Sequence, residues 1–311
     1  MKKTFLMADM GGTNIRFAIF HNNEIMNLEV FKCADFSSFE EALICYEQKA
    51  GKLPKQFVLA VPGVAKQEVY RFVNNKWQFL LSDIKEKFGF KDIVILNDFE
   101  AVAYALPTLD EKNLHCLQSK NLNGNDFPYI VMGFGTGLGV GMLLPIANGY
   151  HAIPSEGGHI GVAPQNETEQ KIYDFILKKY GRVSAERVIS AQGLENVYQA
   201  LTGKKMSSTE IVSNALSGKK DEKNALLQMF AFWGDVAGNL ALSICAKSGV
   251  YLTGNIFQTQ GVLELLKKSD FIKRFCFKGR HTSLVESIPV YVVDVPYLAF
   301  QGMAQIGLSL F

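Results

Sequence analysis

Three acidic side chains and one histidine occur where a ligand rich in hydroxyl groups would need them. Asp98 lies just beyond the short apolar strand predicted at residues 93–96, and ligands of open α/β sheets bind beyond the carboxyl ends of strands. A carboxylate there can accept the proton of a substrate hydroxyl as that hydroxyl attacks a phosphoryl group. Capping of the following helix is the competing interpretation, and the position of Asp98 alone does not separate the two.

The other three candidates lie in two short polar runs. Glu156 and His159 flank a pair of glycines, and Glu186 belongs to the run Ser-Ala-Glu-Arg at 184–187. Together these side chains offer acceptors and a donor to several hydroxyl groups of one polar ligand. Taken singly, Glu186 is more typical of a solvated helix residue paired with Lys or Arg, and His159 of a structural histidine. The prediction of a binding site therefore depends on the set, not on one member.

Two glycine-threonine turns supply a complementary chemistry. They read Asp-Met-Gly-Gly-Thr-Asn at 9–14 and Gly-Phe-Gly-Thr-Gly-Leu-Gly at 133–139, and each lies between two apolar runs, which predicts tight β-hairpins. Exposed backbone N–H groups in such turns form nests for anions, and threonine adds a hydroxyl donor. The pair predicts a clamp on a polyphosphate, with contacts at Gly11, Gly12, Thr13, Asn14, Gly135, Thr136 and Gly137.

A purely structural role is the alternative for either turn alone, because glycines in hairpins commonly supply positive φ. Neither turn matches the Gly-x-x-x-x-Gly-Lys-Ser/Thr phosphate loop, and strand-like residues follow both, unlike in a dinucleotide-binding fingerprint. Asp9, beside the first turn, is a candidate ligand for Mg²⁺ through water, because Mg²⁺ keeps much of its hydration in proteins. A hydrogen bond from Asp9 to the turn itself is an equally good interpretation.

Strand and helix signals alternate along the chain, as in α/β proteins. The first third predicts strands at 4–9, 14–20, 24–31, 57–61 and 93–96 and helices at 38–49 and 99–105. A second such pattern opens at Tyr129, with strands on both sides of the second turn. Later segments predict helices from Asn166 to Gly181, from Ser207 to Gly218 and over 222–247, strands at 250–253 and 290–293, and a last helix after Pro296.

Composition sets the broad class. A chain of 311 residues is long for one hydrophobic core and fits two domains. With 48% hydrophobic residues and a net charge of +2, it carries no footprint for nucleic acid or an acidic membrane. The five cysteines are scattered, which favours reduced thiols in a cytoplasm over a structural zinc site. Polar residues interrupt the apolar stretch 225–246, which predicts a buried helix and not a membrane span.

Six ordered motifs resemble the bacterial glucokinase family, within the superfamily of sugar kinases, heat-shock ATPases and actin. They lie at 9–16, 96–99, 133–139, 156–159, 184–188 and 238–242 and cover most of the chain. The resemblance implies a two-domain, actin-like (ribonuclease H-like) α/β fold with an interdomain cleft. We expect a small domain at 1–108 completed by a helix at 297–311, and a large domain at 109–296.

The resemblance also implies an activity, which is the ATP-dependent phosphorylation of the 6-hydroxyl of glucose, a step of glycolysis in the cytoplasm. It implies that Asp98 is the general base, and that the sugar ligands are Asn97, Glu156, His159 and Glu186. The two turns match phosphate-binding segments, and residues 249–257, with Gly254, match the adenosine side. Expected partners are glucose and ATP with Mg²⁺, and a second copy of the chain in a homodimer.

Two alternatives remain open at this level. A kinase for another hexose, such as mannose or an amino sugar, would keep the phosphate clamp and Asp98 and change the hydroxyl contacts. A sugar-binding regulator that has lost catalysis would keep the fold alone. The presence of Asp98 speaks against the second alternative.

Overall fold

The computed structural model describes residues 3–63, 65, 68–71, 77–118 and 126–311. The chain divides into two compact units. The first comprises Met1–Thr108, His151–Pro154 and Val295–Phe311, and the second comprises Leu109–Tyr150 and Ser155–Asp294.

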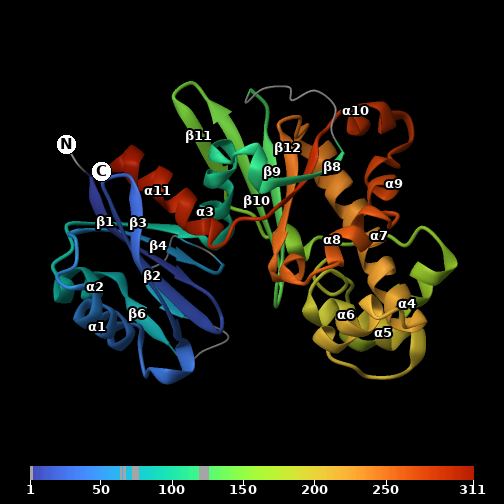
Figure 1. Ribbon diagram of the computed structural model, residues 1–311, viewed down its shortest axis with the longest axis horizontal. Coiled ribbons are helices and arrows are strands. Elements are labelled where there is room, and N and C mark those ends of the chain that lie inside the picture. Colours follow the sequence, from blue (N-terminus) through green and yellow to red (C-terminus); the bar gives the residue numbers. More distant parts are fainter. Residues whose placement is uncertain (1–2, 64, 66–67, 72–76, 119–125) are drawn as a thin grey trace. The chain divides into compact units, whose positions relative to one another are not determined.

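A five-stranded sheet forms the centre of the first unit (Figure 1), with the order β3-β2-β1-β4-β7. Its strands are β1 (Thr4–Met10), β2 (Asn14–His21), β3 (Glu24–Lys32), β4 (Gln56–Val61) and β7 (Asp92–Asn97). The first three strands form an antiparallel meander, whereas β4 runs parallel to both β1 and β7. The carboxyl ends of β1, β4 and β7 therefore meet at one edge of this sheet, where α/β proteins bind ligands.

Helices cover both faces of this sheet. One face packs Leu6, Phe17 and Phe57 against the buried sides of α1 (Phe39–Ala50) and α2 (Leu81–Phe88). Successive strand residues point to opposite faces, so Phe5 faces the other side and contacts α11 (Leu298–Leu310). The smaller elements of this unit are η1 (Cys33–Asp35), β5 (Val69–Arg71), β6 (Gln78–Leu80), α3 (Asp98–Ala105) and η2 (Leu106–Thr108).

Helix α11 packs tightly along α3, and Figure 1 shows the two side by side. A Cβ atom placed on Gly302 would lie 1.7 Å from the carbonyl oxygen of Ala101, so only glycine fits there. This contact brings the two helix backbones together. The C-terminal segment thereby fixes α3, the helix that begins at Asp98.

The second unit is built on a six-stranded sheet with the order β11-β10-β9-β12-β13-β8. Its strands are β8 (Leu114–Gln118), β9 (Tyr129–Phe134), β10 (Leu138–Ile146), β12 (Gly249–Gly254) and β13 (Val290–Val293). Strand β11 (Gly149–Ile153) begins in this unit and ends in the segment His151–Pro154 that belongs to the first. Strands β9 and β10 form an antiparallel hairpin, and β12 runs parallel to β9 and β13. Apart from β8, this sheet has the same topology as the first, which agrees with the second α/β pattern that opens at Tyr129.

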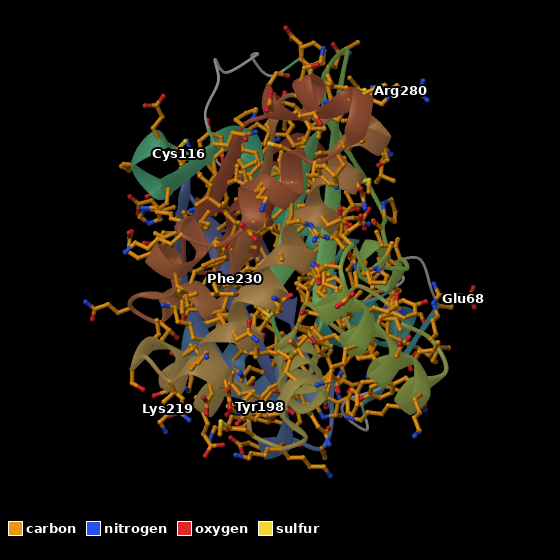
Figure 2. The ribbon with its side chains drawn as sticks, turned by 90° about the vertical axis from the view of Figure 1, so that its right-hand side faces the viewer. Glu68, Cys116, Tyr198, Lys219, Phe230 and Arg280 are labelled. Atoms are coloured by element: carbon orange, nitrogen blue, oxygen red, sulfur yellow. The ribbon has the colours of Figure 1, made fainter. Side chains whose placement is uncertain are left out.

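Most helices of the second unit form a layer around α7 (Lys220–Ile244). In Figure 2, Phe230 of α7 lies within this layer, whereas Lys219 and Arg280 lie at its periphery. The other elements are η3 (Glu111–Asn113), η4 (Gly157–His159), α4 (Glu167–Tyr180), α5 (Ala191–Thr202), α6 (Ser208–Leu216), η5 (Asn255–Gln258), α8 (Val262–Lys267), α9 (Phe271–Cys276), η6 (Gly279–His281) and α10 (Thr282–Glu286).

Two glycines one turn apart explain how α7 packs on α9. A Cβ atom on Gly234 would lie 2.1 Å from the carbonyl oxygen of Phe271. A Cβ atom on Gly238 would lie 2.3 Å from the carbonyl oxygen of Phe275. Helix α7 is long and apolar enough to cross a membrane, but 78% of its most apolar window is buried inside the protein. It is therefore the core helix that the polar residues of this segment predict.

Candidate active site

The first glycine-threonine turn joins β1 to β2, as predicted. The N–H of Gly11 donates to the carbonyl oxygen of Asn14 at 2.9 Å, which leaves Gly12 and Thr13 exposed at the tip. Gly11 does not have positive φ, so its backbone conformation does not require glycine. Because Gly12 has no side chain, the backbone at the tip stays accessible, which is the property that an anion-binding turn needs.

Asp9 lies one residue before the end of β1, opposite Arg16 of β2. The Arg16 guanidinium donates to the Asp9 carboxylate at 2.9 Å. Burial raises the pKa of Asp9, and the charge and hydrogen bond of Arg16 oppose this shift only in part. Asp9 therefore pairs with a side chain of the neighbouring strand.

We predict that Asp9→Asn does not lower the thermal stability at neutral pH. A raised pKa in the folded state means that burial disfavours the ionised carboxylate. At a pH above that pKa, the ionised Asp9 therefore lowers the free energy of unfolding. The neutral amide of Asp9→Asn avoids this loss of stability. The difference in melting temperature between the variant and the parent should shrink as the pH falls toward 4, because Asp9 itself then becomes protonated. Melting temperatures of both proteins between pH 4 and 8 check this, and a lower melting temperature of Asp9→Asn at pH 7 contradicts it.

Asn97, and not Asp98, is the N-cap of α3. Its carboxamide oxygen accepts from the N–H groups of Phe99 and Glu100 at 2.9 and 3.2 Å, and the Glu100 carboxylate accepts from the Asn97 N–H at 2.7 Å. The Asn97 amide nitrogen donates to the carbonyl oxygen of Gly63, just after β4, at 3.0 Å. The capping role that competed for Asp98 at the sequence level therefore belongs to its neighbour.

Asp98 is the first residue of α3 and is partly exposed. Its carboxylate accepts from the N–H of Phe99 at 3.0 Å, and a helix N-terminus favours negative charge. Because β1, β4 and β7 run parallel, Asp98 emerges at the same sheet edge as the first turn. Two strand spacings separate β7 from β1, which is about 10 Å. The first unit thus gathers Asp9, the first turn, Asn97 and Asp98 at one edge.

The second turn joins β9 to β10 and lies against the start of α5. The N–H of Gly135 donates to the carbonyl oxygen of Gly137 at 2.9 Å, and Thr136 is exposed. The N–H of Ala191, the first residue of α5, donates to the carbonyl oxygen of Gly135 at 3.0 Å. The positive end of this helix dipole therefore adjoins the turn and favours an anion there.

Helix α5 was not predicted from the sequence. Its Ser190 side chain accepts from the N–H of Gly193 at 2.9 Å, a normal cap. Gly193 in the first turn weakened the helical signal, but a Cβ atom there would lie 2.5 Å from the carbonyl oxygen of Val188. Close packing therefore explains glycine at this position. The serine at 190, a typical N-cap residue, is the sequence signal that could have predicted the start of α5.

The three predicted hydroxyl ligands of the second unit come from two segments that pair with each other. The N–H groups of Ala185 and Glu186 donate to the carbonyl oxygens of Ile160 and Gly158, both at 2.8 Å. A Cβ atom on Gly158 would lie 1.9 Å from the carbonyl oxygen of Leu138, so this glycine lets η4 lie flat on β10. These contacts bring the segments that carry Glu156, His159 and Glu186 together beside the second turn.

The side chains of this set are accessible to a ligand. Glu156 and His159 are 62% and 57% exposed, and the His159 Nε2 lies 3.8 Å from a Glu156 carboxylate oxygen. Glu186 lies in a turn and not in a helix, and one of its carboxylate oxygens, Oε2, accepts from the N–H of Leu138 at 3.1 Å. The interpretation of Glu186 as a solvated helix residue is therefore wrong.

Gly254 ends β12 opposite Phe134, next to the second turn. Its φ is +129°, and a Cβ atom there would lie 2.1 Å from the carbonyl oxygen of Phe134. The fold of this unit therefore requires glycine at this position, whatever its part in binding the adenosine side of ATP.

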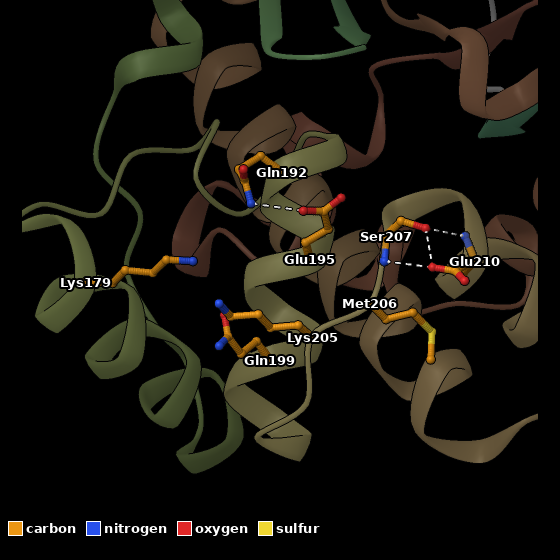
Figure 3. Close-up of a pocket in the computed structure, with 8 residues that line it drawn as sticks. All are labelled: Lys179, Gln192, Glu195, Gln199, Lys205, Met206, Ser207 and Glu210. Atoms are coloured by element: carbon orange, nitrogen blue, oxygen red, sulfur yellow. Dashed lines mark hydrogen bonds between the residues drawn. The ribbon is translucent and has the colours of Figure 1, made fainter.

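A polar pocket of about 570 Å³ lies among α4, α5 and α6 of the second unit (Figure 3) and includes none of the predicted site residues. Several of its side chains serve as helix caps. Glu210 accepts from Ser207 in a capping box, and Glu195 accepts from the N–H of Ser208, which ties α5 to α6. These hydrogen bonds explain the polar lining structurally.

The donors of both units suit a hydrated metal ion and phosphate groups better than a directly bound metal. Among the residues that the structure describes, no group of three or more His, Cys, Asp or Glu side chains could hold a metal ion directly. The Arg16 cation beside Asp9 also disfavours direct coordination of Mg²⁺, so Asp9 would hold such an ion only through water. The exposed backbone tips of both turns fit phosphate groups.

Comparisons with known proteins agree with one another. A family model described as Glucokinase matches residues 6–309. A glucokinase of Marinobacter nauticus is 35% identical over 311 residues, with 96% of each chain covered. The crystal structure of a glucokinase from an Antarctic psychrotroph superimposes with a TM-score of 0.87 at 30% identity, covering 99% of both chains. A glucokinase from Balamuthia mandrillaris in complex with glucose, 20% identical, has a TM-score of 0.81 over 99% of this chain and 94% of its own, which supports the fold.

Proposed function

We propose residue roles from the premise that this chain belongs to the glucokinase family. It is an ATP-dependent kinase that phosphorylates glucose to glucose 6-phosphate. Its fold is the two-domain actin-like fold of these kinases. The proposal concerns which side chains carry out the reaction and how.

Asp98 is the general base in this proposal. The observation that carries the assignment is that Asn97 supplies the cap of α3, which leaves the Asp98 carboxylate at the sheet edge beside the first turn. The 6-hydroxyl of glucose donates a hydrogen bond to Asp98, attacks the γ-phosphorus of ATP and passes its proton to the carboxylate as the O–P bond forms. ADP leaves with the electrons of the broken bond.

Glu156, His159 and Glu186 hold the glucose through its other hydroxyl groups. Their carboxylates and imidazole provide acceptors and a donor on two paired segments. Asn97 contributes less directly, because its carboxamide oxygen caps α3 and its nitrogen holds the loop at Gly63. It positions Asp98, and the second hydrogen of its amide is the donor that a sugar oxygen can use.

The two turns bind the phosphates of ATP through Gly11, Gly12, Thr13 and Asn14 in the first unit and Gly135 and Thr136 in the second. Backbone donors already in place cost no reorganisation when charge develops on the transferring phosphoryl group. A Mg²⁺ ion near Asp9, held through water, would neutralise phosphate charge when bound. Gly254 ends β12 next to the second turn, and we assign it to the adenosine side.

We predict that Glu156→Gln and Glu186→Gln weaken glucose binding more than ATP binding. Hydrogen bonds to charged groups contribute about 1.5 to 3 kcal/mol, so the KM for glucose should rise about 10- to 100-fold in each variant. Initial rates at varied glucose and fixed saturating ATP measure this. An unchanged KM for glucose in either variant would remove that residue from the sugar site.

A hexose panel tests the proposed function. Glucose, mannose, glucosamine and N-acetylmannosamine are offered with MgATP in an assay that couples ADP release to NADH oxidation. In a parallel series polyphosphate replaces ATP, and the sugar phosphate formed is measured directly, because this donor releases no ADP. Glucose with ATP should give the highest kcat/KM. A preference for mannose or an amino sugar would establish the other hexose kinase, and no sugar-dependent ADP release with any of them would establish a non-catalytic sugar-binding protein.

Location and assembly complete the proposal. A kinase that consumes ATP and glucose and carries five free cysteines fits the cytoplasm. A homodimer is the assembly that we propose, and light scattering of the purified protein measures its mass against the 34.6 kDa of one chain.

A further inference from the structure

Gly137 of the second turn lies against a carboxylate. A Cβ atom placed on Gly137 would lie 2.3 Å from Oε2 of Glu186 and 3.2 Å from its Cδ, whereas its backbone does not have positive φ. The requirement for glycine is therefore space and not conformation. Gly135, two residues earlier, differs, since a Cβ atom there would meet only the carbonyl oxygen of Gly137 at an ordinary 3.8 Å.

The backbone around Glu186 is held on both sides. Its N–H donates to the carbonyl oxygen of Gly158 at 2.8 Å, and its carbonyl oxygen accepts from the Ser190 hydroxyl at 2.8 Å. The carboxylate is in turn held by the N–H of Leu138, the residue after Gly137. A larger residue at 137 would therefore displace the flexible end of the Glu186 side chain before it displaced the backbone.

We propose that Gly137 is a positioning residue for the acceptor sugar: its missing side chain makes room for the Glu186 carboxylate, which links the sugar site to the phosphate-binding turn. Oε2 of Glu186 accepts from the turn, and Oε1 is the oxygen offered to a glucose hydroxyl. A carboxylate has enough lone pairs for both contacts. The proposal rests on the sugar-binding role of Glu186 given above.

In this proposal the residues of the second turn contact different substrates. Thr136 and the backbone at Gly135 face phosphate, whereas Gly137 acts on glucose through Glu186. Because one carboxylate contacts both the turn and the sugar, its place sets how far the sugar lies from the transferring phosphoryl group. An error of about 1 Å in such positioning is enough to lower turnover by about 100-fold.

The central variant is Gly137→Ala. Its KM for glucose should rise about 10- to 100-fold, the effect of a displaced charged hydrogen bond. Its KM for ATP should rise by a smaller factor than its KM for glucose. Gly161→Ala is the matched control, because Gly161 pairs with Ser184 in the same segment, lacks positive φ and has no atom within 4 Å of a Cβ position. It should retain the glucose KM of the parent enzyme.

A double-mutant cycle tests whether Gly137 acts through Glu186. Removing the carboxylate in Glu186→Ala also removes the clash, so Gly137→Ala should add almost nothing in that background. Glu186→Asp, with a shorter side chain, should recover part of the glucose affinity that Gly137→Ala loses. Additive effects of the two alanine substitutions on the glucose KM would overturn the proposal, as would a Gly137→Ala enzyme whose KM rises for ATP alone.

These outcomes separate the inference from the proposed function. If Glu186→Gln leaves the glucose KM unchanged, the sugar-binding role of Glu186 is wrong. If Glu186→Gln raises it and Gly137→Ala does not, the role of Glu186 stands and that of Gly137 is overturned. If circular dichroism shows that Gly137→Ala does not fold, the double variant Gly137→Ala/Glu186→Ala becomes the test. It should fold and have the same glucose KM as Glu186→Ala. A double variant that does not fold, or whose glucose KM differs, also overturns the proposal.

Discussion

Asp98→Asn should lower turnover by about 10² to 10⁴, the usual contribution of a general base. The amide is close in size to the carboxylate but cannot take the proton of the attacking hydroxyl. Because we assign the glucose hydroxyl groups mainly to Glu156, His159 and Glu186, we expect glucose affinity to change by only several-fold. Steady-state kinetics give turnover, and calorimetric titration of glucose gives the affinity.

The stability of Asp98→Asn provides the control for this result. Asn97 and Glu100 form the capping box of α3 without Asp98, so the substitution keeps the cap, and the loss of negative charge at the helix N-terminus should cost at most about 1 kcal/mol. Asn97→Ala removes the cap and should cost about 1 kcal/mol. Turnover of Asp98→Asn within about 3-fold of the parent would exclude Asp98 as the base.

Arg274→Met should destabilise the protein by about 3 to 5 kcal/mol, because it removes one partner of a buried ion pair and leaves the other charge buried. Glu169 is 1% exposed and accepts from two nitrogens of the Arg274 guanidinium, at 2.6 and 3.2 Å. It also accepts from the N–H of Gln165 and the amide of Asn166, at the start of α4. Without Arg274, the Glu169 charge would stay buried with two neutral donors only.

The same helix α9 offers a matched control. Lys273 pairs with Asp270 at 3.7 Å, but both side chains are exposed, by 77% and 64%. Lys273→Met should therefore change the free energy of unfolding by at most about 0.5 kcal/mol. Urea denaturation measures both variants. In the Glu169→Gln background, where no buried charge is left behind, Arg274→Met should cost less, and equal costs in the two backgrounds would contradict the account.

The elements that the sequence predicted well are those whose signals are local. The hairpins β1-β2 and β9-β10 follow from apolar runs on both sides of a turn, and the fold class follows from the alternation of strands and helices. Helices α4 and α6 begin after Asn166 and Ser207, whose side chains cap them. Helix ends were less exact, as α7 spans Lys220–Ile244 and not 222–247.

The elements that the sequence missed depend on distant contacts. Strand β8 is a half-exposed edge strand with mixed residues, and its pairing with β13 joins segments far apart in the chain. Helix α5 carries Gly193 in its first turn because of the nearby Val188 carbonyl. Hydrophobic periodicity in the sequence predicts neither of these contacts.

The candidate site shows the same limit. Residue types identified Asp98 and Glu186, but pattern alone could not tell a cap from a base or a surface residue from a ligand. The structure shows that Asn97 is the cap, with Gly63 as a second partner, and that Glu186 accepts from Leu138. The roles of base and sugar ligand remain proposals. The reason for glycine at 137 likewise lies 49 positions away, in a carboxylate that touches it.

The central claim is that phosphoryl transfer from ATP to the 6-hydroxyl of glucose depends on the Asp98 carboxylate. A rapid-quench single-turnover experiment with γ-labelled ATP and saturating glucose measures that chemical step directly, free of product release. The account predicts labelled glucose 6-phosphate from the parent enzyme and a chemical step slowed at least about 100-fold in Asp98→Asn that still binds glucose. An undiminished chemical step in that variant, or label on another hydroxyl group, would contradict it.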